Sequence, residues 1–274
     1  MTDNMKIFIK AGKNKNSLIA LEHITAIIEK HNHSFYISSD NGKTDEENVK
    51  QSDLIITVGG DGTLLSMNSI AIKYNKPILG INVGRLGFLT AIEGNQLEKL
   101  EEFFTRPDEF EIKKHSLLQA KINNGRWKYC LNDVVIAKHM FSNTISTKVY
   151  CNDSGIANIV CDSLIVATST GSTAYSLSAG GPIVDNDLQA LVISPVAVHS
   201  LNATPMVLAK DKTITVKFDN SRKQDIFVSF DGENHEQISE NDVVAVKLSS
   251  KALNIYSAKD LGQFAKVDKK IKVR

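Results

Sequence analysis

The sequence predicts an α/β domain with a parallel sheet, followed by a domain of antiparallel strands packed as a β-sandwich. Two observations predict this order of classes. Over the first hundred or so residues, short apolar runs alternate with helix-period patterns, whereas beyond Pro107 strand patterns follow one another across tight-turn sequences. The length of 274 residues suits one large domain or two of ordinary size. We expect the α/β domain to span residues 1–108 and the sandwich to span residues 109–256.

The α/β pattern begins with an apolar run at Lys6–Ile9, which predicts a first strand. From Ser17, which is placed to cap a helix, apolar residues recur at helical spacing. Leu54–Val58 is an apolar run without polar alternation, as in a strand covered on both faces. After Thr63 a helical pattern runs through Ile72 and is broken by Pro77, and Ile78–Val83 predicts another buried strand. Strands and helices in this alternation indicate right-handed crossovers between parallel strands.

Two further interpretations concern the ends of helices and the end of the chain. Asn95, with Glu98 three residues later, resembles a capping pair before a helix that carries Phe103 and Phe104. The lysine-rich tail that begins at Lys266 is short, and we interpret it as a solvated end.

Tight-turn sequences mark the second half of the chain. Asn123-Asn124-Gly125 separates two strand patterns, and Asn152–Gly155 separates two more, so both segments predict hairpins. Asp231-Gly232 is a further turn signal within later β-rich runs. A helical turn predicted at Thr173–Ala179 interrupts them. Such spacing is typical of a β-sandwich.

Composition excludes several classes of protein. The 32 basic and 31 acidic side chains give a net charge of +1, which argues against a non-specific nucleic-acid binder. No apolar run of about 18 residues exists, and the N-terminus lacks the basic and long apolar segments of a signal peptide. The three cysteines include no C-x-x-C pair, which favours free thiols in a reducing compartment. We therefore expect a cytoplasmic protein that binds neither nucleic acid nor membranes.

The strongest local signal is Gly59-Gly60-Asp61-Gly62-Thr63, which lies between a buried strand and a helical pattern. Consecutive glycines permit positive φ angles and let main-chain N–H groups approach an anion closely. With a helix N-terminus behind it, such a loop favours phosphate as its ligand. Asp61 would then lie beside a polyphosphate, placed to accept a proton from an attacking hydroxyl or to help hold Mg²⁺. A tight strand–helix turn capped by Asp61 is the structural alternative.

A second cluster runs from Thr168 to Pro182 and is rich in hydroxyl side chains flanked by glycines. This composition is poor for a strand core and suits a loop that hydrogen-bonds a polar ligand, with Tyr175 able to stack on a base. A third signal is the polar pair Asn132-Asp133 within a strand-like run. Taken alone, that pair indicates either a bulge at the rim of the sandwich or a ligand contact.

Together these segments resemble the NAD kinase family. The residues that carry the resemblance are Val58–Leu64, Gly84–Leu89, Asn132-Asp133 and Gly171–Pro182, in the family's order and spacing. The Gly-Gly-Asp-Gly-Thr element is shared with diacylglycerol and sphingosine kinases, whereas the Gly171–Pro182 stretch is far more specific.

The resemblance implies an N-terminal Rossmann-like α/β domain and an antiparallel β-sandwich domain that binds NAD, with the C-terminal tail, residues 257–274, returning to the first domain. It implies transfer of the terminal phosphate of ATP to the 2′-hydroxyl of the adenosine ribose of NAD, which gives NADP. Mg²⁺ or another divalent cation would accompany ATP, with no residue assigned as its protein ligand. The resemblance also implies a homodimer or homotetramer.

The resemblance assigns roles to individual residues. Asp61 would be the general base on the 2′-hydroxyl. The residues that would face phosphate are Gly59, Gly60, Gly62, Thr63 and Arg85. The residues that would bind NAD are Gly62, Phe88, Asn132, Asp133, Thr173, Ala174, Tyr175 and Ser178, together with Asp162 from a neighbouring subunit.

The chain departs from the family pattern around the walls of the implied pocket. The departing residues are Ser163, Ser169, Val198 and Thr204, where the family usually has Gly, Pro, Pro and Arg. We expect these departures to affect specificity more than activity. Two other function classes stay open: a lipid kinase that shares the catalytic loop, and a dinucleotide sensor that has lost turnover.

Overall fold

The structure is a computed structural model that describes residues 4–84, 87–140, 142–199, 203–221, 223–259 and 262–272. By its internal contacts the chain divides into two compact units, residues 1–115 with 253–274 and residues 116–252. Two long strands, β6 (Phe110–Ile122) and β17 (Val244–Ala258), carry the chain from one unit into the other.

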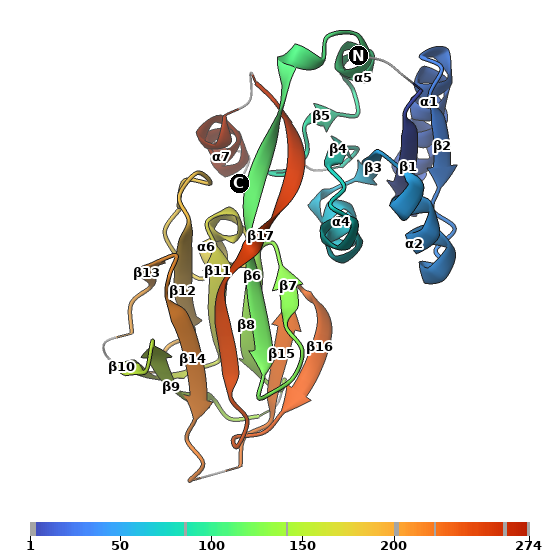
Figure 1. Cartoon of the computed structure of the whole chain (residues 1–274). Coiled ribbons are helices and arrows are strands. Elements are labelled where there is room, and N and C mark those ends of the chain that lie inside the picture. Colours follow the sequence, from blue (N-terminus) through green and yellow to red (C-terminus); the bar gives the residue numbers. More distant parts are fainter. Residues whose placement is uncertain are drawn as a thin grey trace. The chain divides into compact units, whose positions relative to one another are not determined.

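The first unit contains a parallel sheet with helices (Figure 1). Its elements are β1 (Lys6–Ala11), α1 (Lys15–Lys30), β2 (Ser34–Ile37), α2 (Gly42–Gln51), β3 (Leu54–Gly59), α3 (Asp61–Leu65), α4 (Asn68–Tyr74), β4 (Ile78–Asn82), β5 (Ile92–Glu93), α5 (Glu98–Thr105), the 3₁₀ helix η1 (Pro107–Glu109) and α7 (Gln263–Lys272). The strands lie in the order β4, β3, β1, β2, and the end of β17 pairs in parallel with β4 at Ile255 and Ile78. The C-terminal segment thus returns to the first unit.

The second unit is a sandwich of two antiparallel sheets. Its other elements are β7 (Lys128–Cys130), β8 (Asp133–Lys138), β9 (Ile145–Cys151), β10 (Ser154–Cys161), β11 (Ser163–Thr168), the 3₁₀ helix η2 (Thr170–Thr173), α6 (Tyr175–Ser178), β12 (Ala190–Val196), β13 (Met206–Ala209), β14 (Thr213–Phe218), β15 (Ile226–Phe230) and β16 (Glu233–Ile238). One sheet has the order β13, β12, β11, β8, β15, β16, and the other includes β10, β9, β14 and β17. The predicted fold class is confirmed.

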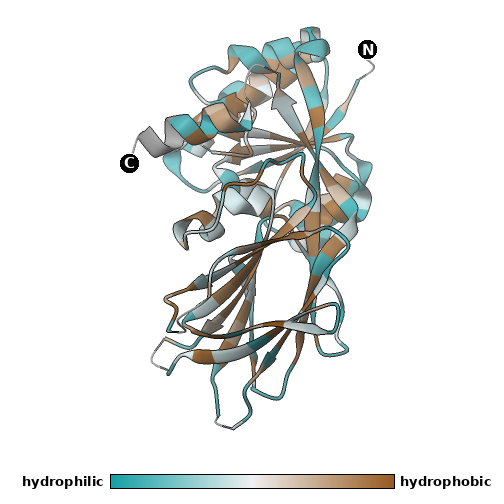
Figure 2. Cartoon of the chain, turned by 90° about the vertical axis from the view of Figure 1, so that its left-hand side faces the viewer, coloured by the Kyte–Doolittle hydropathy of each residue, from teal (hydrophilic) through white to brown (hydrophobic). Residues whose placement is uncertain are grey.

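Each unit has its own hydrophobic core. Side chains of β1, β3 and β4 pack with α1 and α5 in the first unit, and both sheets contribute buried side chains to the second core. The strands are mostly hydrophobic in Figure 2, whereas the loops at their ends are mostly hydrophilic. The buried faces of β3 explain its run of apolar residues without alternation.

Some helix ends differ from the prediction because local hydrogen bonds decide them. The side chain of Asn14, and not that of Ser17, caps α1, since its Oδ1 accepts a hydrogen bond from the Ser17 N–H at 2.9 Å. Helix α5 begins at Glu98 after Leu97 and has no side-chain cap, so the capping role predicted for Asn95 is wrong. The long helix predicted after Thr63 is two short ones. The Ser66 hydroxyl bonds the Thr63 carbonyl between them and competes with the main-chain ladder.

Candidate functional site

Main-chain N–H groups fix both oxygens of the Asp61 carboxylate. Asp61 is the first residue of α3, just beyond the end of β3. Its Oδ2 accepts a hydrogen bond from the Phe88 N–H at 2.9 Å, and its Oδ1 accepts one from the Leu89 N–H at 3.1 Å. The residue is only partly buried. The segment after β4 therefore holds this carboxylate in one orientation and leaves it accessible to a ligand.

The glycines around Asp61 differ in how closely neighbouring atoms approach them. A Cβ at Gly59 would lie 2.2 Å from the Thr63 Oγ1, and a Cβ at Gly87 would lie 2.6 Å from the Asp61 Oδ1, so close packing requires both glycines. A Cβ at Gly60 or Gly62 would meet nothing within 4 Å. None of the loop glycines has a positive φ, so the expected left-handed conformation is absent from this loop. The space beside Gly60 and Gly62 is open to a ligand.

The segment that holds Asp61 is itself held from the other side. Lys266, on α7, donates hydrogen bonds from its Nζ to the carbonyl oxygens of Phe88 at 3.1 Å and Thr90 at 2.8 Å. Its exposed fraction is 7%. The interpretation of the chain end from Lys266 as solvated is therefore wrong for this side chain. The carbonyls of Phe88 and Thr90 accept the hydrogen bonds that water would otherwise accept from its ammonium group.

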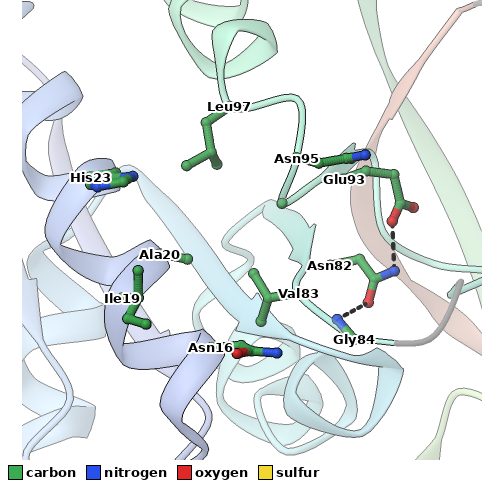
Figure 3. A pocket seen from close by; sticks show the side chains of 11 residues that line it. Asn16, Ile19, Ala20, His23, Asn82, Val83, Gly84, Glu93, Asn95 and Leu97 are labelled. Atoms are coloured by element: carbon green, nitrogen blue, oxygen red, sulfur yellow. Dashed lines mark hydrogen bonds between the residues drawn. The ribbon is translucent and has the colours of Figure 1, made fainter.

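A cavity of about 460 Å³ lies in the first unit beside the end of β4 (Figure 3). On one side it is lined by α1 between Asn16 and His23, including Ile19, and on the other by the last residues of β4 and β5 and the residues that follow them. The side-chain amide of Asn82 forms part of the cavity wall. Its N–H donates to the Glu93 carboxylate at 2.7 Å, and its oxygen accepts from the Gly84 N–H at 3.2 Å. The described residues that line it include no lysine or arginine.

In the second unit, one carboxylate organises the polar pair that the sequence singles out. Asp231, in the turn after β15, accepts hydrogen bonds from the main-chain N–H groups of Leu131, Asn132 and Asp133 at 2.7, 2.7 and 3.1 Å. In return, the Asp231 N–H donates to the Asp133 carbonyl at 3.0 Å. Asn132 and Asp133 therefore have a fixed main-chain conformation at the start of β8.

The Asp133 side chain is 5% exposed and lies in a setting that disfavours its charge. Burial raises the pKa of Asp133 to about 7, and the nearby charge of Asp231 adds to the effect. Near neutral pH this carboxyl therefore exists in both protonation states, one able to donate a hydrogen bond and the other only to accept.

This shift predicts how stability depends on pH. The pKa of Asp133 is about 7 in the folded chain against a reference value of 3.8, so between these pH values the folded chain binds a proton that the unfolded chain has released. The stabilisation is complete below pH 3.8 and is lost as the pH rises through 7. We expect Asp133→Asn, which cannot ionise, to gain on the order of a few kcal/mol relative to the wild type between pH 4 and pH 8, as measured by denaturant unfolding.

The matched control is Asp153→Asn. Asp153 is exposed in the β9–β10 turn at a φ of 66°, a conformation that Asn also adopts readily. The difference in the free energy of unfolding between Asp153→Asn and the wild type should not change with pH. A constant difference for Asp133→Asn as well would contradict the assigned burial of this carboxyl.

The hydroxyl-rich segment after β11 mostly hydrogen-bonds to itself. The Thr168 hydroxyl donates to the Leu131 carbonyl at 2.6 Å and accepts from the Gly171 N–H at 2.9 Å. The Ser172 hydroxyl donates to the Ser169 carbonyl at 2.6 Å, and the Ser176 and Ser194 hydroxyls lie 2.8 Å apart. These buried hydroxyls therefore stiffen the loop, whereas the sequence suggested that they bind a ligand.

The more accessible side chains of the same loop are those that the resemblance assigns to the ligand. Tyr175 is 46% exposed, Ser178 is exposed, and Thr173 and Ala174 are partly buried. Asp162 lies elsewhere in the unit, between β10 and β11, and its carboxylate pairs with the Lys138 ammonium at 3.1 Å. Arg85 lies outside the described residues.

Two residues of these sites escape sequence reasoning. Asp231 carries only a turn signal in the sequence, and its contacts with Leu131–Asp133 span about a hundred residues. In the sequence alone, Lys266 is one of several lysines in a charged C-terminal segment. In the part of the chain that is described, no three His, Cys, Asp or Glu side chains gather as a metal-binding group, and no helix is long and apolar enough to cross a membrane.

Comparison with known families gives matches over most of the chain. Residues 9–109 match the family model of the ATP-NAD kinase N-terminal domain, and residues 131–258 match that of the ATP-NAD kinase C-terminal domain. Together the two matches span both units.

Individual relatives agree. The chain is 36% identical over 228 residues to an NAD kinase from Caldanaerobacter subterraneus subsp. tengcongensis, which covers 81% of this chain and 80% of that protein. It is 35% identical over 266 residues to an NAD kinase from Caldicellulosiruptor bescii, which covers 97% of this chain and 98% of that protein.

Solved structures share the fold. An NAD kinase from Archaeoglobus fulgidus, crystallised with ATP, superimposes with a TM-score of 0.80 at 22% identity over 98% of this chain and the whole of that chain. Yeast NADH kinase in complex with NADH superimposes with a TM-score of 0.83 at 20% identity over 99% of this chain and 88% of that chain.

Proposed function

The chain belongs to the ATP-NAD kinase family, which makes it a phosphotransferase, and from this premise we propose how its residues carry out the NAD kinase reaction. The reaction transfers the terminal phosphoryl group of ATP to the 2′-hydroxyl of the adenosine ribose of NAD and gives NADP and ADP. The observation that carries the proposal is the carboxylate of Asp61, fixed through both oxygens and flanked by the open positions Gly60 and Gly62.

Asp61 is the general base of this mechanism. It accepts the proton of the ribose 2′-hydroxyl while that oxygen bonds to the terminal phosphorus of ATP, and the bond from this phosphorus to the bridging oxygen of ADP breaks. The N–H groups of Phe88 and Leu89 keep the carboxylate in place during the transfer. Phosphoryl transfer depends mainly on positioning and charge neutralisation, so a fixed base suits it.

The phosphoryl donor enters as its magnesium complex. Mg²⁺ usually keeps several waters and binds through substrate phosphates and one or two carboxylates. The open space beside Gly60 and Gly62 would leave room for the ion on the phosphates, where it would neutralise their charge. The loop residues Gly60, Gly62 and Thr63 face the phosphates in this proposal.

The adenosine of NAD binds to residues of the sandwich domain, residues 109–256. Asn132 and Asp133, held by Asp231, hydrogen-bond the adenine and the ribose hydroxyls. Thr173, Ala174, Tyr175 and Ser178 form the adenine end of the pocket. The exposed ring of Tyr175 supports this role, since exposed aromatic faces are available for stacking on a base.

The cavity beside β4 accommodates the nucleoside of ATP. Its volume falls within the usual range for small-molecule pockets, and aliphatic side chains together with Asn82 and Glu93 match a base and the hydroxyl groups of its ribose. The absence of lysine and arginine from its described lining favours the uncharged part of the nucleotide. The Val83 N–H donates to the Gly59 carbonyl at 3.3 Å, so the cavity wall adjoins the end of β3, from which a phosphate chain reaches Asp61.

Blocking this cavity should weaken ATP binding alone. We expect Ile19→Trp to raise the KM for ATP about tenfold, a loss of about 1.4 kcal/mol of binding, with the KM for NAD unchanged. Leu18→Trp is the matched control, because Leu18 is 52% exposed against 47% for Ile19 but does not line the cavity. Steady-state kinetics with each substrate varied in turn makes the comparison. Equal KM values for ATP in the two variants would exclude this location.

A neighbouring subunit completes the NAD site in a homodimer or homotetramer, and contributes Asp162. The partly exposed position of Asp162, whose side chain is 34% accessible, supports such a role. The free state of Cys130, Cys151 and Cys161 supports action in the cytoplasm. Light scattering of the purified protein with and without NAD measures the number of subunits.

The test of the proposed function is formation of NADP from NAD and MgATP by the purified protein. NADP formation supports the kinase. Binding of NAD without NADP formation would indicate a sensor, and absence of NAD binding would turn attention to lipid substrates.

A further inference from the structure

The C-terminal helix α7 places a buried ammonium directly behind the segment that holds the catalytic carboxylate. Lys266 donates from its Nζ to the carbonyls of Phe88 and Thr90 at 3.1 and 2.8 Å, and its exposed fraction is 7%. Val267, the next residue of the helix, is also buried, which fixes this part of α7 against the first unit. Lysine is almost never so deeply buried unless it is paired. Its position therefore depends on the carbonyls that it contacts.

The same short segment faces Asp61 with its N–H groups. Phe88 uses its N–H for the Asp61 Oδ2 and its carbonyl for the Lys266 Nζ, while Leu89 and Thr90 supply the second N–H and the second carbonyl. The Phe88 carbonyl and the Leu89 N–H belong to one peptide group, and a cation at this carbonyl makes that N–H a better donor, so the contacts of Lys266 and Asp61 with this group reinforce each other. The segment thus lies between an ammonium and a carboxylate.

A buried histidine is part of the surroundings of Lys266. His115 lies near it, and burial lowers the pKa of His115 to about 4, with the charges of Lys113 and Lys266 adding to the shift. That imidazole is therefore neutral at pH 7 and adds no second positive charge beside Lys266.

We propose that Lys266 is a positioning residue for the phosphoryl transfer, which orients the N–H groups of Phe88 and Leu89 and through them the Asp61 carboxylate. The inference rests on the proposed role of Asp61 as general base. It makes the last helix of the chain part of the active machinery, although that helix is about 180 residues away in sequence from the segment that it holds. Misplacement of a catalytic group by about 1 Å lowers rates by up to about 10²-fold, so a neutral residue at this position should slow the chemical step.

The experiment compares Lys266→Met, Lys266→Arg and the control Lys259→Met, in which an exposed lysine just before α7 is changed. We expect Lys266→Met to lower kcat about 10- to 100-fold with the KM values for NAD and ATP within about twofold of the wild type. Lys266→Arg, which keeps a cation able to donate to both carbonyls, should recover most of kcat. Lys259→Met should match the wild type.

The outcomes separate this inference from the function on which it rests. Absence of NADP formation by the wild type would contradict the proposed function itself. An active wild type with an equally active Lys266→Met overturns the positioning role alone. Loss of NAD binding together with kcat in Lys266→Met, without recovery in Lys266→Arg, also overturns it, because that pattern indicates a purely structural lysine. Should Lys266→Met not fold, Lys266→Gln, which keeps one donor without the charge, is judged by the same criteria.

Discussion

Asp61→Asn is expected to lower kcat by about 10²- to 10⁴-fold, as loss of a general base typically does. The amide cannot accept the proton of the 2′-hydroxyl. It also offers only one acceptor oxygen to the N–H groups of Phe88 and Leu89, which now bond both carboxylate oxygens. NAD affinity should change little, because the residues proposed to bind the adenosine lie in the other unit. NADP formation and equilibrium NAD binding, measured on the same preparation, test both statements.

The control is Asp108→Asn, which removes an exposed carboxylate of the same unit from η1. Near wild-type turnover in that variant shows that loss of one negative charge from this unit does not by itself slow the reaction. Turnover by Asp61→Asn within about threefold of the wild type would rule out the general-base role.

Much of the fold could be predicted because its signals are local. The apolar run of β3 follows from burial on both faces, and the positive φ angles of Asn152 and Asp153 are what the residues of a tight hairpin turn favour. Helix ends were harder to predict, since the choice between Asn14 and Ser17 as the cap of α1 depends on the local hydrogen bond that forms.

The residues of the candidate site likewise differ in whether the local sequence identifies them. Asp61 stands in a contiguous glycine-rich segment, so the sequence alone singles it out. Asp231 and Lys266 act through contacts with residues about 100 and 180 positions away, and nothing in their own neighbourhood indicates such contacts. The segment around Thr168 and Ser172 has the composition of a ligand site, but the hydroxyls of these two residues donate their hydrogen bonds to buried main-chain carbonyls nearby.

Gly171→Ala is expected to destabilise the second unit by about 3 kcal/mol and to weaken NAD binding at least tenfold. A Cβ at Gly171 would lie 1.9 Å from the carbonyl oxygen of Asn132 and 2.4 Å from its carbonyl carbon. Both atoms belong to the main chain, so no change of rotamer relieves the clash, and either η2 or the start of β8 must move. Movement of β8 displaces Asn132 and Asp133 from the N–H contacts with Asp231. Such a loss corresponds to a melting temperature lower by roughly 6 to 12 °C.

Gly155→Ala provides the matched control within the same unit, because a Cβ there would lie 3.7 Å from the nearest ring atom of Tyr150, an ordinary contact distance. Its melting temperature should stay close to that of the wild type, since an alanine fits at this strand position. Calorimetry and NAD titration of both variants then separate a general cost of replacing glycine from the specific approach of Gly171 to Asn132. If Gly171→Ala had the melting temperature of the wild type and bound NAD as tightly, the packing of η2 against the start of β8 could not be what positions Asn132 and Asp133.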